Sequence, residues 1–162
     1  MSRVLVIGIG NAYHGDDAAG LEIARRVRDA CLGGVMVEEC SEDMVELLDA
    51  WQDSDVVVLI DAVQSGSPLG TIFRFDALAE VLPSCFVRQV SSHGIGMPES
   101  IELARALDRL PRNLIVYGVE GALFELGAAL SPEVEAVLDT AADRIVGELR
   151  SSEQPPEASG AA

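Results

Sequence analysis

Apolar runs alternate with amphipathic stretches along the first sixty residues. Residues 3–10 are almost wholly apolar, rich in Val and Ile, and end in two glycines, which is typical of a strand buried on both faces that stops at a tight turn. Residues 35–40 and 56–60 are predicted as the next two strands, and apolar residues at helical spacing fill 18–30 and 45–51 between them. Two successive βαβ units in one largely parallel sheet follow from this order.

The second half of the chain adds two strands and two helices to this pattern. Residues 71–75 alternate as in an edge strand with one wet face, and the short loop before them allows an antiparallel direction. A helix is predicted from Pro98 and a buried strand over 113–119. Ser131, followed by Pro and Glu, predicts the cap of a last helix with inward apolar residues as far as Leu149.

Length and composition favour one domain. The chain has 162 residues, enough to bury a sizeable core, and we expect a single α/β domain over residues 1–150. Residues 151–162 are small, polar and Pro-containing, which predicts a disordered tail. The formal net charge of −16 disfavours nucleic-acid and membrane-surface partners, because phosphates and anionic headgroups would be repelled.

The location predicted from the sequence is the cytoplasm. The apolar runs are far shorter than the roughly 20 residues of a membrane-spanning helix, and the apolar start runs into glycines and aspartates rather than into a signal-peptide cleavage site. The three cysteines, Cys31, Cys40 and Cys85, are widely spaced and form no C-x-x-C pair. We therefore expect buried apolar cysteines rather than a disulfide framework or a thiolate zinc site.

Acidic and histidine side chains follow the predicted strands. Asp16 and Asp17 come after the first strand, Asp61 after the third, and His93 lies in a Ser-Ser-His-Gly turn. Each has a structural explanation of its own: a helix cap for an aspartate of the first pair, an Asx-turn for Asp61 and an exposed loop position for His93. Ligands of open α/β sheets, however, bind at the carboxyl ends of the strands. Two carboxylates and an imidazole at this edge suit a divalent metal such as nickel or zinc.

A dinucleotide site is the alternative that the Gly8-x-Gly10 turn raises. Glu38 or Glu39 lies near the position of a ribose-binding acid. The third glycine of that motif is replaced by Tyr13, which we expect to obstruct the close approach of helix and strand. Because two aspartates would also place negative charge near the phosphates, nucleotide binding is disfavoured.

Four motifs, taken together, resemble those of the hydrogenase maturation endopeptidases. They are Val-Ile-Gly-Ile-Gly-Asn through Gly-Asp-Asp-Ala-Ala-Gly over residues 6–20, Leu-Ile-Asp-Ala over 59–62, Ser-Ser-His-Gly over 91–94 and Tyr-Gly-Val-Glu-Gly over 117–121. Their order and spacing match over nearly the whole chain to about residue 150. The resemblance implies a phosphorylase/hydrolase-like, three-layer α/β/α fold with a mixed five-stranded sheet of order 2-1-3-5-4, in which strand 4 is antiparallel.

The resemblance also implies an activity and a set of site residues. The family removes a C-terminal extension from the large-subunit precursor of a nickel-iron hydrogenase after nickel insertion. Carried over by position, its catalytic and metal-contacting residues are Asp17, Asp61 and His93. The sequence departs from the family at residues 39–43, where Glu-Cys-Ser-Glu-Asp replaces a frequent Asp-Gly-Gly-Thr loop, and Asp17 stands where many relatives have Glu.

These features predict an aspartate- or metal-dependent peptidase. We expect nickel supplied by the substrate as the recognition element, no nucleotide cofactor, a hydrogenase precursor as the protein partner and a monomeric enzyme. The metal could polarise the scissile carbonyl or activate a water, with a carboxylate as general base. Two alternatives are a non-catalytic module that holds a metal-loaded partner and a nucleotide-dependent Rossmann-like enzyme.

Overall fold

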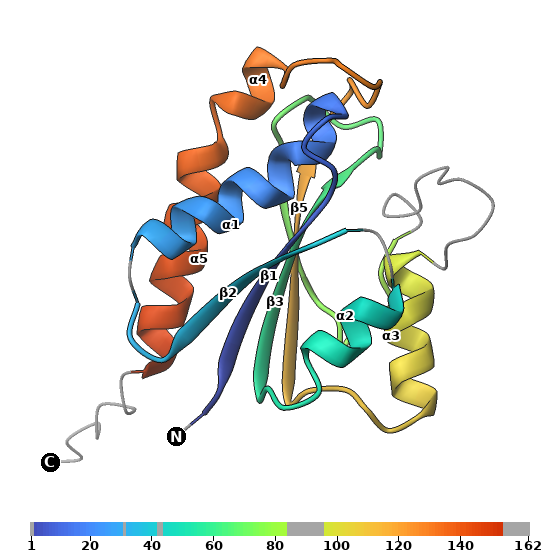
Figure 1. Ribbon diagram of the computed structural model, residues 1–162, viewed down its shortest axis with the longest axis vertical. Helices are drawn as coiled ribbons and strands as arrows, with labels where there is room; N and C mark the ends of the chain where they lie inside the picture. The colour runs from blue at the N-terminus through green and yellow to red at the C-terminus, as the bar shows by residue number, and fades with distance from the viewer. Residues whose placement is uncertain (1, 31, 42–43, 84–95, 154–162) are drawn as a thin grey trace, which may run out of the picture.

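A five-stranded sheet runs through the computed structural model of the protein, which describes residues 2–30, 32–41, 44–83 and 96–153 (Figure 1). Its strands lie in the order β2-β1-β3-β5-β4. Only β4 runs antiparallel to its neighbour among the paired strands. The strands are β1 (Val4–Ile9), β2 (Val35–Cys40), β3 (Val56–Val63), β4 (Ile72–Asp76) and β5 (Asn113–Glu120). The predicted order and the predicted antiparallel strand are confirmed.

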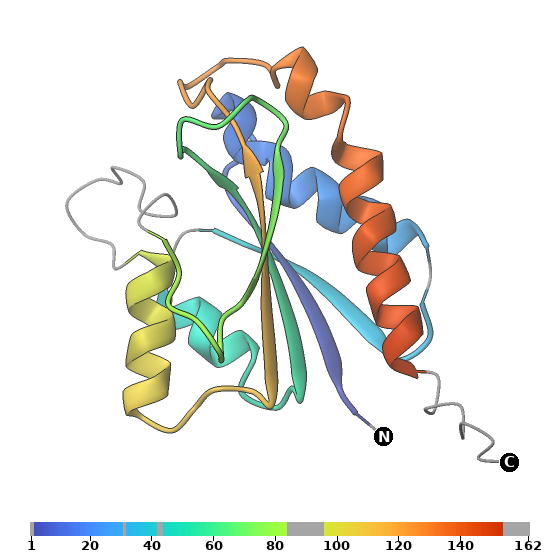
Figure 2. The same ribbon diagram turned by 180° about the vertical axis from the view of Figure 1, so that it is seen from behind.

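Helices cover both faces of the sheet, which confirms the three layers. On one face, α1 and α5 pack side by side, and α2 and α3 cover the other face (Figures 1 and 2). None of the described helices combines the length and the apolar character that crossing a membrane requires. The helical elements are the 3-10 turn η1 (Gly15–Ala18), α1 (Ala19–Asp29), α2 (Met44–Ala50), α3 (Met97–Ala106), α4 (Pro132–Glu135) and α5 (Leu138–Glu153).

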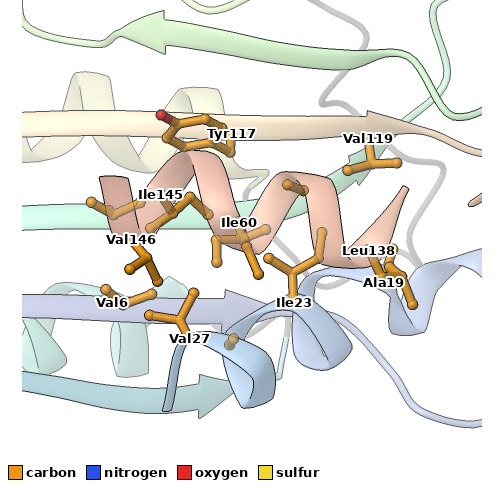
Figure 3. Packing of buried hydrophobic residues seen from close by; sticks show 14 of the residues in the cluster. Val6, Ala19, Ile23, Val27, Ile60, Tyr117, Val119, Leu138, Ile145 and Val146 are labelled. Carbon is orange, nitrogen blue, oxygen red and sulfur yellow. The ribbon is translucent and has the colours of Figure 1, made fainter. Parts of the chain in front are cut away.

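The central strands are apolar without alternation because both of their faces are buried. In β3, Val58 and Ile60 join the core under α1 and α5, whereas Val57 and Leu59 join the core under α2 and α3. Figure 3 shows the first of these cores, in which side chains of α1 and α5 meet those of the sheet. The second core contains the buried Trp51, whose indole N–H donates to the Arg109 carbonyl at 3.1 Å.

The first helix approaches the sheet so closely that glycine is required on both sides. A Cβ on Gly8 would lie 2.7 Å from the Cβ of Ala24, and a Cβ on Gly20 would collide with the carbonyls of Ile9 and Ile60. Tyr13, which we expected to obstruct this approach, is instead exposed. That expectation is wrong because Gly8 and Gly20, and not the position of Tyr13, determine how near the helix lies.

Two predicted elements, the third strand and the last helix, differ from the structure by more than one residue. The third strand continues past Ile60 to Val63, because its last residues pair with β5 as far as Glu120. The last predicted helix is divided into α4 and α5, since the Val137 N–H donates to the carbonyl of Val134, a tighter spacing than that of an α-helix. The same helix then reaches Glu153, so the first residues of the predicted tail are helical.

Candidate active site

Asp17 is placed by the turn that ends β1. Gly10 has φ +152°, and a Cβ there would collide with the Asp17 carbonyl, so only glycine fits this turn. Oδ1 of Asp17 lies 3.6 Å from where that Cβ would stand. The buried Asp17 therefore lies at the carboxyl end of β1, within η1.

Neither aspartate of the pair is the predicted helix cap. His14 occupies the cap position of η1 and Ala18 that of α1, and neither helix has a side-chain cap hydrogen bond. Both Asp16 and Asp17 lie inside the 3-10 turn, with their side chains buried. The capping prediction is wrong because the turn η1 precedes α1. Both aspartates lie within η1, before the cap position of α1.

Asp61 lies within β3 rather than after it. Its side chain is buried, and Oδ1 accepts the Ala62 N–H at 2.8 Å. Since side chains alternate along a strand, Asp61 faces the α2 and α3 side with Leu59 and Val63. The pairing of β1 with β3 runs as far as Gly8 opposite Ile60, so Asp61 follows at the level of Ile9, the last residue of β1.

The topology brings the two carboxylates to one edge of the sheet. The η1 turn contacts β3, and it occupies the space past the end of β1. The third predicted residue, His93, lies outside the described residues, and α3 begins four positions later at Met97, which is buried in the core on the Asp61 face. Within the described ranges, no group of three or more His, Cys, Asp or Glu side chains is arranged to hold a metal ion.

Asp16 fixes the geometry of this edge, a role that the sequence did not indicate. Its carboxylate is fully buried. It accepts the backbone N–H groups of Ala122 at 2.8 Å, Leu123 at 3.0 Å and Ser131 at 2.7 Å, together with the Ser131 hydroxyl at 2.6 Å. Ser131 does hold the predicted cap position of α4, but its hydroxyl is used by Asp16 and not for the cap.

The charge of Asp16 is stabilised where it is buried. Burial alone would raise the pKa of this carboxyl group, but the hydrogen bonds from Leu123, Ser131 and Ala122 outweigh it and lower the pKa below the ordinary 3.8. An ionised Asp16 thus joins η1 to the loop after β5. The neighbouring Asp17 is held on the same rigid turn.

Glu120 is a second buried acid that sequence reasoning left unassigned. It is the last residue of β5, and its carboxylate accepts the Ser65 and Gly66 N–H groups, each at 2.9 Å, and the Ser65 hydroxyl at 2.6 Å. These bonds fix the loop between β3 and β4 at the same sheet edge. The position of Glu120 at the end of an apolar buried strand could have indicated this role, because a buried carboxylate requires hydrogen-bond donors.

The chain is similar in sequence to a family of known proteins. The family model for hydrogenase maturation proteases matches residues 36–148, more than half of the chain. The Hydrogenase 2 maturation protease of Escherichia coli (strain K12) is 27% identical over 154 residues, which are 93% of this chain and 92% of the relative.

Solved structures agree with that match. The hydrogenase maturating endopeptidase HybD from E. coli aligns with a TM-score of 0.75 at 25% identity, over 93% of this chain and 94% of that chain. The solution structure of an endopeptidase from Escherichia coli aligns with a TM-score of 0.79 at 27% identity, with the same coverage of both chains. Sequence, strand order and three-dimensional fold agree, and the chain belongs to the hydrogenase maturation protease family.

Proposed function

We propose that this chain is an endopeptidase that removes the C-terminal extension of a nickel-iron hydrogenase large-subunit precursor after nickel insertion. Membership in the family supports the peptidase activity. The observation that carries the proposal is the convergence of two buried carboxylates, Asp17 and Asp61, at the carboxyl edge of β1 and β3. A relative named as a maturation protease and a neighbour named as a maturating endopeptidase support the substrate class.

The donor set fits a nickel ion carried by the substrate. Carboxylate oxygens and an imidazole nitrogen suit metals of borderline softness. Asp17 and Asp61 would supply the oxygens, and His93 remains the predicted source of the nitrogen. When bound, the ion supplies positive charge that polarises the scissile carbonyl.

Recognition through the metal would make cleavage depend on completed nickel insertion. Carboxylates held on a rigid turn and within a strand offer fixed contacts, so a nickel-loaded precursor would be positioned with its scissile peptide at the edge. One carboxylate would then take a proton from the attacking water as general base and pass it to the leaving nitrogen as the C–N bond of the scissile peptide breaks. Asp61 is our choice for this role, because it lies within a central strand and is paired there with Gly118 of β5.

A cleavage assay tests the proposal. The nickel-loaded and the nickel-free forms of a hydrogenase large-subunit precursor are each incubated with the purified enzyme, and the released C-terminal peptide is measured by mass spectrometry. We expect release only from the nickel-loaded form. Binding without release would favour the non-catalytic holding module, whereas release from both forms would remove the metal from the recognition step.

Variants at the site separate chemistry from folding. Asp61→Asn keeps the volume but removes the anion, so we expect cleavage to fall by about 10²-fold or more while circular dichroism stays unchanged. His93→Ala and Asp17→Asn should lower cleavage in the same way. Asp76→Asn is the matched control, since the carboxylate of Asp76 accepts the Leu78 N–H in a turn at the other end of β5, a role that Asn also fills. Full activity in Asp61→Asn would refute the mechanism.

A further inference from the structure

Large apolar side chains are exposed on two loops near Asp17, at the carboxyl edge of the sheet. Tyr13, in the loop before η1, is 75% exposed. Leu123 and Leu126, in the loop after β5, are 47% and 76% exposed. We call these three residues the apolar loop surface. Both loops lie at the same end of the molecule (Figures 1 and 2).

The backbone beneath the apolar loop surface is held by hydrogen bonds between the two loops. The Gly127 N–H donates to the Tyr13 carbonyl at 2.7 Å, and the Asp16 N–H donates to the Leu123 carbonyl at 2.6 Å. His14 adds a third link, with Nδ1 at 3.3 Å from the Phe124 carbonyl. With the Asp16 carboxylate on Leu123, these bonds fix the loops before any partner arrives, so binding would cost little ordering entropy.

The segments that carry the apolar loop surface contain acidic residues but no Lys or Arg. Residues 4–24 and 113–143, which include both loops, have neither of these basic residues. Glu125, between the two exposed leucines, is itself exposed. An apolar centre with an acidic rim is complementary to a partner surface that has an apolar centre and a basic rim.

We propose that the apolar loop surface docks the folded body of the precursor protein whose extension is cleaved. This inference rests on the proposed function and adds the place where the substrate is held. The loop that carries Tyr13 continues directly into η1 and Asp17. A protein seated on this surface would therefore have its C-terminal extension next to the edge formed by β1 and β3. The docked face of the precursor would be apolar at its centre and basic around it.

Steady-state cleavage of nickel-loaded precursor tests the docking surface. We expect Leu126→Ser and Tyr13→Ser each to raise KM by about tenfold without changing kcat, because truncation of a central interface residue weakens binding by roughly that factor. Met36→Ser is the matched control: Met36 is 64% exposed, but it lies on β2 opposite Leu5, near the amino end of the sheet. Raising the salt concentration should also raise the KM of the wild-type enzyme, since salt screens the acidic rim.

The possible results separate this inference from the proposed function. An unchanged KM in both loop variants, or an equal rise in Met36→Ser, would overturn the docking surface while leaving the peptidase in place. A fall in kcat at constant KM would overturn it too, because the residues would then act in the chemical step. If the wild-type enzyme cleaves no precursor, the proposed function fails, and this inference fails with it.

Discussion

The buried carboxylate of Asp16 is the residue on which the shape of the candidate site depends most. Its four hydrogen bonds reach both the loop after β5 and the start of α4. Asp16→Asn would place an amide NH2 group against backbone donors, leaving some of them unsatisfied. We expect the free energy of unfolding in urea to fall by about 2–4 kcal/mol at neutral pH. Asp143→Asn, at an exposed position of α5, should change it by no more than about 0.5 kcal/mol.

The same residue predicts how stability depends on pH. Because hydrogen bonding lowers the pKa of Asp16 in the folded state below 3.8, its contribution is fully present above that pH. It is lost as the pH falls through the lower, folded-state pKa. The stability difference between wild type and Asp16→Asn should therefore shrink when urea unfolding is measured at pH values below 3.8. A difference that stays constant as the pH falls would show that the charge of Asp16 contributes nothing.

The burial of Asp61 inside β3 could not be predicted from its neighbours in the sequence. The apolar run correctly predicts a carboxylate near the end of a buried strand, but it predicts that the strand stops before Asp61. Pairing with β5 continues the strand to Val63, and this pairing depends on residues more than fifty positions away. The position of Asp61 at the sheet edge was thus predictable, whereas its burial inside a strand was not.

Among the elements, the features that depend on nearby sequence were predicted best. The bounds of β2 and the antiparallel direction of β4 agree with the structure, because one depends on a local apolar run and the other on a short connecting loop. The η1 turn and the division between α4 and α5 were not predicted. The η1 turn is held by tertiary contacts, such as the hydrogen bond from the Ser131 hydroxyl to Asp16, which no local sequence pattern records.

The fit of α1 against the sheet gives a prediction with an internal control. In isolation, Gly→Ala in a helix is favourable by up to about 1 kcal/mol. At Gly20, however, the new Cβ would collide with the carbonyls of Ile9 and Ile60, so we expect Gly20→Ala to destabilise the protein by about 1–3 kcal/mol. Gly147→Ala in α5, where a Cβ meets nothing within 4 Å, should stabilise it by about 0.5–1 kcal/mol. Denaturant unfolding measures both, and an equal effect at the two positions would contradict this packing.

The contact between α5 and the sheet predicts an abnormal tyrosine titration. The Tyr117 hydroxyl donates to Glu148, which also accepts bonds from Arg74 of β4. Burial, and then the bond to Glu148, raises the pKa of Tyr117 to about 12. Tyr117 is neutral in the folded state, so its contribution to stability is present below pH 10 and is lost as the pH rises towards 12.

Absorbance of the phenolate measures this titration in a Tyr13→Phe variant, in which Tyr117 is the only tyrosine. We expect a midpoint near pH 12 while circular dichroism still reports a folded protein. Glu148→Gln removes the negative charge that accepts the hydrogen bond of the Tyr117 hydroxyl, so it should lower the midpoint. A midpoint near pH 10 in the folded Tyr13→Phe variant would contradict the hydrogen bond between α5 and β5.

At the scale of the whole molecule, negative charge is in large excess. The chain has 27 Asp and Glu residues against 11 Lys and Arg, and the formal net charge is −16. Among the described residues, the ion pairs involve exposed or half-exposed side chains, such as Arg25 with Glu22 and Arg105 with Glu102. Pairs of this kind contribute about 0–1 kcal/mol each, so repulsion among the remaining acids should dominate the response to salt.

We therefore expect the melting temperature to rise with ionic strength. Between about 0.01 M and about 0.15 M salt, the screening length falls from about 30 Å to about 8 Å, which weakens repulsion across the molecule. Thermal unfolding followed by circular dichroism measures the effect, and a fall in melting temperature would show that the ion pairs outweigh the repulsion. Sodium chloride and choline chloride should act alike, because screening does not depend on the identity of the cation. A larger rise with a divalent cation at equal ionic strength, lost in Asp61→Asn, would instead report binding at the candidate site.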